Sequence, residues 1–150
     1  MKIGNKDFNT NHTHIMGILN ITPDSFSDGG NFNSIDSALY HAERMIADGA
    51  DLLDIGGEST RPGYDMITPQ EEIDRILPVI SAIKARLDIP ISVDTYKSQV
   101  AEMAISAGAD MINDIWGLKH DSGMGSIIAK AGIPVCIMHN RKENNYIDLI

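Results

Sequence analysis

Short apolar segments and stretches of helical periodicity follow one another along the chain, and this order is the feature that most limits the possible folds. The apolar segments are 15–20, 51–56, 90–95, 110–115 and 134–139. They are nearly continuous in apolar residues, which is typical of parallel strands covered on both faces. Strands separated by helices are joined by right-handed crossovers in one parallel sheet. The sequence therefore predicts an α/β fold with about five parallel strands.

The helical segments between the strands carry recognisable ends. Ser34 is a candidate N-cap for the first helix, and Gly49 stands where a left-handed residue commonly ends one. A capping box over 68–71, with Pro69 at the first helical position, predicts the start of the second helix. Pro78 lies inside that helix, so we expect a kink or a split there. The predicted helices are 34–48, 69–87, 96–107 and 122–131.

Composition narrows the class of protein further. The 150 residues fit one domain, 1–150, and residues 2–9 predict a small hairpin about Gly4 and Asn5 that precedes the first long strand. A net charge of −9 provides no general attraction to nucleic acid or to anionic membranes, and no apolar run reaches the roughly 20 residues of a membrane span. The single cysteine, Cys136, excludes an internal disulfide and fits a reducing cytoplasm. It lies in an apolar strand, so we expect it to be buried and inert.

Each apolar segment finishes in a polar residue. The carboxyl ends of parallel strands share one edge of the sheet, where such folds bind ligands. The alternative is that these residues only form turns or cap helices. The residues are Asn20, Asp54, Asp94, Asn113 with Asp114, and His139.

Two loops after the first two strands are rich in glycine, hydroxyl groups and charge. In the loop 22–30, Asp24 and Asp28 join Asn20 as candidate oxygen ligands for Mg²⁺. In the loop 56–63, Arg61 offers a planar fork for phosphate or carboxylate, and two hydroxyl residues precede it. The alternative is that both are solvated loops made of turn-forming residues.

Four motifs in order resemble the signatures of the dihydropteroate synthase family, folate-pathway enzymes that sulfonamides block. They are MGILNITPDSFSDGG (16–30), DIGGESTRPG (54–63), ISVDT (91–95) and INDI (112–115). The resemblance implies a (β/α)8 TIM barrel, of which this chain would form an incomplete barrel of about five parallel strands. It also implies a transferase that joins 7,8-dihydropterin-6-ylmethyl diphosphate to p-aminobenzoate, releasing diphosphate and forming 7,8-dihydropteroate.

The resemblance also implies roles for individual residues. Asn20 resembles the Mg²⁺ ligand beside the diphosphate, and Asp94 and Asn113 resemble the groups that read the pterin edge. Thr60 and Arg61 resemble the second-loop contacts to the diphosphate, so the catalytic set would be Asp94, Asn113 and Arg61. A first-loop residue would help to order the closed state, and three residues would form the walls around p-aminobenzoate. These are Asp28 for the closed state, and Phe26, Ser59 and Pro62 for the walls.

The departure from the family is length, since an eight-stranded barrel needs about 250 residues. Strands six to eight are absent from this sequence, and with them a second pterin-reading aspartate, a lysine and an Arg-x-His motif. Open edges on the first and fifth strands should drive association into a homodimer or a larger assembly. We also expect the isolated chain to have little synthase activity.

Two other functions fit parts of the pattern. One is a pterin-binding barrel domain of a methyltetrahydrofolate corrinoid methyltransferase, which would share the pterin-reading Asp and Asn but lacks the full DSFSDGG and GESTRPG loops and does not process diphosphate. The other is a non-catalytic half-barrel that binds a partner chain. Mg²⁺-dependent binding of diphosphate separates the synthase from the methyltransferase, whereas pterin binding without turnover, or no binding, favours the half-barrel.

Overall fold

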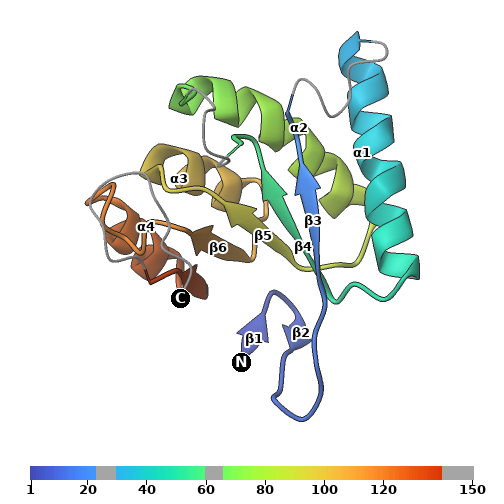
Figure 1. The fold of residues 1–150 in the computed structure, drawn as a ribbon, viewed down its shortest axis with the longest axis horizontal. Helices are drawn as coiled ribbons and strands as arrows, with labels where there is room; N and C mark the ends of the chain where they lie inside the picture. Colours follow the sequence, from blue (N-terminus) through green and yellow to red (C-terminus); the bar gives the residue numbers. More distant parts are fainter. Residues whose placement is uncertain (23–29, 60–65, 140–150) are drawn as a thin grey trace.

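A five-stranded parallel sheet organises the computed structural model, which describes residues 1–22, 30–59 and 66–139. The strands lie in the order β3-β4-β5-β6-β7, so sequence order and spatial order agree, and β3 and β7 form the two edges (Figure 1). Their bounds are β3 Met16–Asn20, β4 Leu52–Gly56, β5 Ile91–Asp94, β6 Met111–Asp114 and β7 Val135–Ile137. The predicted α/β class and the five parallel strands are confirmed. The sheet does not close on itself, so the molecule is an incomplete barrel.

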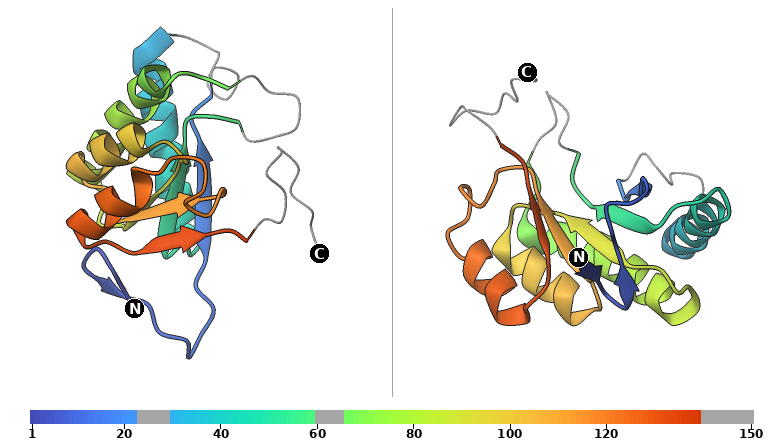
Figure 2. Two further views of the ribbon diagram at one scale, coloured as in Figure 1. Left: turned by 90° about the vertical axis from the view of Figure 1, so that its left-hand side faces the viewer. Right: turned by 90° about the horizontal axis from the view of Figure 1, so that it is seen from below.

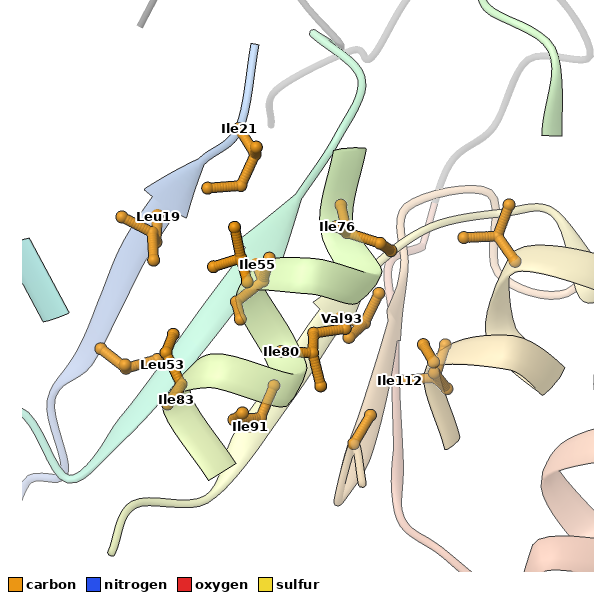
Figure 3. Packing of buried hydrophobic residues seen from close by; sticks show 14 of the residues in the cluster. Leu19, Ile21, Leu53, Ile55, Ile76, Ile80, Ile83, Ile91, Val93 and Ile112 are labelled. Carbon is orange, nitrogen blue, oxygen red and sulfur yellow. The ribbon is translucent and has the colours of Figure 1, made fainter. Parts of the chain in front are cut away.

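Four helices cover one face of this sheet, as the left view in Figure 2 shows. They are α1 Gly30–Ala47, α2 Pro69–Arg86, α3 Ser98–Ser106 and α4 Met124–Ala131. Every second residue of the central strands points at them; Leu53, Ile55 and Ile91 are fully buried there. Figure 3 shows these strand residues against Ile76 and Ile80 of α2. Burying such side chains stabilises the fold by about 1.5–3 kcal/mol each, so the core lies between sheet and helices.

The opposite face of the sheet is only partly covered, which corrects the expectation that both faces of the strands are buried. Met16 and Ile18 of the edge strand β3 point away from the helices and are 39% and 61% exposed. In a closed barrel this face would be the interior, filled by side chains from all the strands. With five strands the wall is incomplete, so Met16 and Ile18 on this face of β3 remain exposed.

A small hairpin covers one end of that open face. The strands β1 Lys2–Ile3 and β2 Lys6–Asp7 pair antiparallel about Gly4, as predicted. Ile3 and Phe8 form a second buried cluster with Leu52 of β4 and Met111 of β6. The hairpin therefore closes the end at which the strands begin, below the sheet in Figure 1, and leaves the other end free for a site.

Two predictions about the helices need correction. The first helix begins at Gly30 rather than at 34, so Ser34 lies within it and is not its N-cap; the apolar repeat that identified the helix starts only at Ile35. The second helix runs unbroken through Pro78, so the expected split is wrong. Pro78 is exposed, and water can bond the carbonyl that its missing N–H leaves free. The start of this helix is as predicted, because Thr68 Oγ1 accepts the Glu71 N–H at 3.2 Å.

Cys136 is exposed, so the prediction that it is buried is wrong. It lies on the edge strand β7 and points to the open face, where fewer neighbours cover it than on a central strand.

No helix among the described residues is long and apolar enough to cross a membrane.

Candidate functional site

The strand register brings the predicted polar residues into one row at the carboxyl end of the sheet. Asn20 pairs with Gly56, Gly56 with Asp94, and Asp94 with Asn113. The residues before them, such as Ile55 and Val93, pack against the helices, so the row faces the open side of the sheet. The structure therefore brings Asn20, Asp94 and Asn113 together on one face.

Gly56 provides the space between two of these side chains. A Cβ atom at this position would lie 3.5 Å from Asn20 Oδ1 and 3.6 Å from Asp94 Cβ. Because both neighbours lean over the glycine, the amide of β3 and the carboxylate of β5 converge across the intervening strand. A side chain on Gly56 would occupy the place where a ligand can reach both.

Asp54 lies one step below this row, on the same face. It pairs with Ile18 on one side and with Ser92 on the other. Asn113 Nδ2 donates a hydrogen bond of 3.0 Å to Asp54 Oδ2. Asp54 is only 5% exposed, and within the part of the chain that the structure describes neither Asp54 Oδ1 nor Ser92 Oγ has a hydrogen-bond partner. Unmet buried acceptors of this kind are costly and are commonly satisfied by a ligand or by water.

The electrostatics of the row centre on Asp94. Burial is the main cause that raises the pKa of the Asp94 carboxyl to about 7, and repulsion from nearby carboxylates adds to it. At neutral pH the group is therefore poised between its acid and its anion, and hydrogen-bond donors from a ligand would favour the anion. The carboxylates that contribute are Asp54, Glu72, Asp114 and Glu58, in order of effect.

A buried ion cluster lies beside the row. The Lys97 ammonium, on a residue 7% exposed, bonds Glu58 and also bonds Glu72 Oε2 at 2.5 Å. The Tyr96 hydroxyl donates to Glu58 Oε1 at 2.7 Å, so both oxygens of this carboxylate are held. Burial raises the pKa of Glu72, and the contact with Lys97 opposes that rise. The cluster joins the end of β4, the first turn of α2 and the end of β5.

The same helix also holds the backbone next to Glu58. Arg75 Nη1 donates to the carbonyl of Gly57 at 2.8 Å. A Cβ on Gly57 would lie 2.8 Å from Ile76 Cγ2, which is closer than real Cβ contacts, so α2 packs directly on the glycine backbone. Ser59, half-buried, follows this segment. The chain is thus fixed in place where the second glycine-rich loop begins.

The comparisons with known proteins agree with this geometry. The model of the family described as pterin binding enzyme matches residues 16–149, which is most of the chain.

The chain belongs to the pterin-binding enzyme family.

Two curated relatives of this chain are named dihydropteroate synthases. A dihydropteroate synthase of Clostridium beijerinckii is 58% identical along all of this chain, which matches 56% of that protein. A dihydropteroate synthase of Bacillus subtilis is 58% identical over 92% of this chain and 48% of its own length. The chain therefore spans about half the length of the curated relatives it matches.

Solved structures give the same result in three dimensions. A Clostridium difficile dihydropteroate synthase, crystallised in the presence of pteroic acid, superposes with a TM-score of 0.86 at 53% identity, covering 97% of this chain and 53% of that one. A Xanthomonas albilineans dihydropteroate synthase in complex with 7,8-dihydropteroate has a TM-score of 0.78 at 40% identity, with 94% and 50% covered. The fold of this chain is that of the first half of such enzymes.

Several predicted site residues lie outside the part of the chain that the structure describes. Of the residues predicted to bind a substrate or a metal, the structure describes Asn20, Ser59, Asp94 and Asn113. Those that lie outside the described residues are Asp24, Phe26, Asp28, Thr60, Arg61 and Pro62.

Two polar strand ends prove to have other surroundings. Both oxygens of Asp114 accept backbone N–H groups, from Trp116 at 2.8 Å and from Leu118 at 2.9 Å, so this residue forms a turn, as the alternative interpretation holds. His139 is exposed and lies two residues beyond the end of β7. The row of polar residues that faces the open side therefore contains fewer of the strand-end residues than the sequence predicted.

Sequence reasoning missed the ion cluster of Glu58, Glu72 and Lys97. One signal was present, because Glu72 stands at helical spacing with the buried residues Ile76 and Ile83 and is itself only 1% exposed. A charge in phase with an apolar stripe requires a buried partner. Its partner Lys97 lies 25 residues away, and only the packing of α2 beside β5 brings them together.

The described residues contain no group of three or more His, Cys, Asp or Glu side chains that could hold a metal ion. A Mg²⁺ site of a different kind still fits the row. Mg²⁺ commonly takes one or two protein oxygens and completes its shell with phosphate oxygens and water. The amide oxygen of Asn20, exposed at the end of β3, meets that requirement.

Proposed function

We propose that this protein is a dihydropteroate synthase, which joins 7,8-dihydropterin-6-ylmethyl diphosphate to p-aminobenzoate. The observation that carries the proposal is the register row, in which Asn20, Asp94 and Asn113 face one side of the sheet at its carboxyl end. These are the residues for which the sequence motifs imply contact with the substrate.

Pterin recognition follows from the chemistry of two of these groups. A pterin ring presents a line of N–H and amino donors, so it needs acceptors that are fixed in place. Asp94 supplies a carboxylate and Asn113 supplies an amide oxygen on the neighbouring strand. Because the Asp94 pKa is about 7, donors from the pterin favour its anion and bind more strongly as the carboxyl loses its proton.

Diphosphate departure needs positive charge at the other end of the substrate. Asn20 would hold Mg²⁺ against the diphosphate, and Arg61 and Thr60 would bond its oxygens. Bound Mg²⁺ would neutralise the charge that gathers on the leaving oxygens. The C–O bond to the leaving diphosphate breaks with its electron pair on oxygen, and the Arg61 guanidinium stabilises that oxygen.

The second substrate then completes the reaction. The pterin ring donates electrons to the CH₂ group as the C–O bond breaks, and the amine nitrogen of p-aminobenzoate bonds to that carbon and loses a proton. Phe26, Ser59 and Pro62 would form the walls around p-aminobenzoate, and Asp28 would order the closed state that excludes water. The Glu58 cluster supports this role for Ser59, because it holds the residue next to it.

The single domain 1–150 would carry these contacts, and we propose that it associates into a homodimer or a larger assembly in the cytoplasm. The exposed residues Ile18 on β3 and Ile137 on β7 support association, since exposed apolar edge strands pair readily with other chains. The single cysteine is the support for a reducing compartment.

Calorimetry with 7,8-dihydropterin-6-ylmethyl diphosphate tests the proposal. The chain should bind this substrate, and more strongly with Mg²⁺ than without it. Asp94→Asn should weaken binding by about 1–3 kcal/mol, as expected when a hydrogen bond to a charged group is impaired. Arg61→Ala should weaken binding of the diphosphate compound while sparing the free pterin.

The matched control is Asp36→Asn, the same chemical change at an exposed position on α1. It should bind like the unmodified chain. Absence of binding to the unmodified chain, or equal affinity in a folded Asp94→Asn variant, would contradict the proposal. Binding that does not respond to Mg²⁺ would favour the methyltransferase-type pterin domain.

A further inference from the structure

We propose that Asp54 is a positioning residue, which sets the orientation of the Asn113 amide so that its carbonyl oxygen faces the ligand. Neither the motifs nor the family resemblance assigns a role to Asp54. The inference rests on the proposed function for the identity of the ligand, while the orientation itself follows from contacts between residues of this chain.

The hydrogen bond between the two residues has only one polarity. Asn113 Nδ2 donates to Asp54 Oδ2 at 3.0 Å, across the 59 residues that separate them in sequence. An ionised carboxylate accepts hydrogen bonds and cannot donate them, so the NH₂ end of the amide must face Asp54. Oxygen and nitrogen lie on opposite sides of the amide carbon. The Asn113 oxygen is therefore directed away from Asp54.

Asp54 cannot shift to suit another arrangement. It lies in the middle of β4, which is paired on both sides with β3 and β5. Its neighbours Leu53 and Ile55 are fully buried against the helices. A carboxylate held this firmly offers a fixed reference for the side chain that bonds to it.

The cost of burying Asp54 indicates that its charge has a use. It is 5% exposed, and its second oxygen has no partner among the described residues. An apolar side chain of similar volume would avoid the desolvation penalty of a carboxylate here. What the carboxylate adds is the bond that it accepts from Asn113.

Without this bond the Asn113 amide has two orientations of similar energy. Rotation about its last side-chain torsion exchanges the oxygen and the NH₂ group, and that torsion is broad and nearly two-fold. One orientation presents an acceptor to the N–H groups of a pterin, and the other opposes donor to donor. Asp54 removes the second orientation before the ligand arrives.

The test compares Asp54→Leu with Asp54→Asn in the 150-residue chain. Leucine has the same branched arrangement of heavy atoms and no acceptor, whereas the oxygen of asparagine can still accept from Asn113. Calorimetry measures the affinity for 7,8-dihydropterin-6-ylmethyl diphosphate, and urea unfolding measures stability. We expect Asp54→Leu to lose affinity by about tenfold and to unfold at the same or higher urea concentration, because the buried charge is gone. Asp54→Asn should retain most of the affinity.

The matched control is Asp36→Leu, the same replacement at an exposed position on α1. It should bind like the unmodified chain. NMR provides a readout that needs no ligand: the two side-chain NH₂ signals of Asn113 should be dispersed in the unmodified chain and move toward solvent-exposed values in Asp54→Leu.

Unchanged NH₂ signals in Asp54→Leu, or an affinity within about twofold of the unmodified chain, would overturn the inference. If the unmodified chain binds no pterin, the proposed function fails, and the NMR result still decides whether Asp54 orients Asn113.

Discussion

Asp94→Asn should make this chain more stable at alkaline pH while it weakens ligand binding. The Asp94 carboxyl has its pKa raised from 3.8 to about 7, mainly by burial and then by neighbouring carboxylates. The folded chain therefore holds this proton more tightly than the unfolded chain does. As pH rises from about 4 to about 7, the unfolded state increasingly gains by ionising this group, so the free energy of unfolding falls.

The size of the effect follows from the shift. One pKa unit corresponds to 1.36 kcal/mol, so a rise from 3.8 to about 7 costs the folded state about 4 kcal/mol at pH 8. At pH 4.5 the same group costs about 1 kcal/mol, because it is still protonated in the folded chain. Asparagine carries no charge, so the stability difference between Asp94→Asn and the unmodified chain should grow by about 3 kcal/mol from pH 4.5 to pH 8.

Urea unfolding at pH 4.5, 6 and 8 in metal-free buffer measures this difference. Asp36→Asn, an exposed position on α1, is the control for the chemical change alone. The reasoning is wrong if Asp94→Asn is less stable than the unmodified chain at pH 8, or if the difference between them does not change with pH. Confirmation would mean that the site retains a carboxylate at the expense of stability, as expected for a group that binds a ligand.

Three further substitutions test the packing around the site by urea unfolding. Lys97→Met should lower the free energy of unfolding by about 3–5 kcal/mol, because two buried carboxylates lose their counter-ion. The control Lys84→Met removes a more exposed ion pair at the far end of α2 and should lower it by under about 1 kcal/mol. Equal losses in the two variants would contradict the argument that the Lys97 cluster is buried. Gly57→Ala should cost about 1–3 kcal/mol, since the added Cβ would lie 2.8 Å from Ile76 Cγ2; a neutral result would mean that α2 moves freely. Pro78→Ala should raise stability by about 1–3 kcal/mol by restoring a helical hydrogen bond, and a loss would show that the proline is needed.

Much of the fold followed from local patterns. The five strands were found because near-continuous apolar runs between helical repeats have few other solutions. The N-cap at Thr68 was confirmed because a cap depends on residues three positions apart. The start of α1 and a split at Pro78 were predicted wrongly, since the first lacks the apolar repeat and the second depends on solvent access to one turn.

The candidate site, like the fold, could be predicted from the sequence only in part. Asn20, Asp94 and Asn113 could be grouped from sequence, because each ends a strand and parallel strands share direction. The roles of Asp54 and Lys97 could not, since each depends on a partner 25 or more residues away. Cys136 was misjudged because burial of a strand residue depends on what covers that face of the sheet.

By itself, then, the sequence determined that this protein forms parallel βα units, and which polar residues those units carry at the ends of their strands, because both depend on periodicity and on chain direction. Only the tertiary structure decided that Asp54 orients Asn113, that Lys97 joins Glu58 to Glu72, and that one face of the sheet is left open. These properties depend on which surfaces meet across the sheet and helices, and the spacing of residues along the chain does not contain that information.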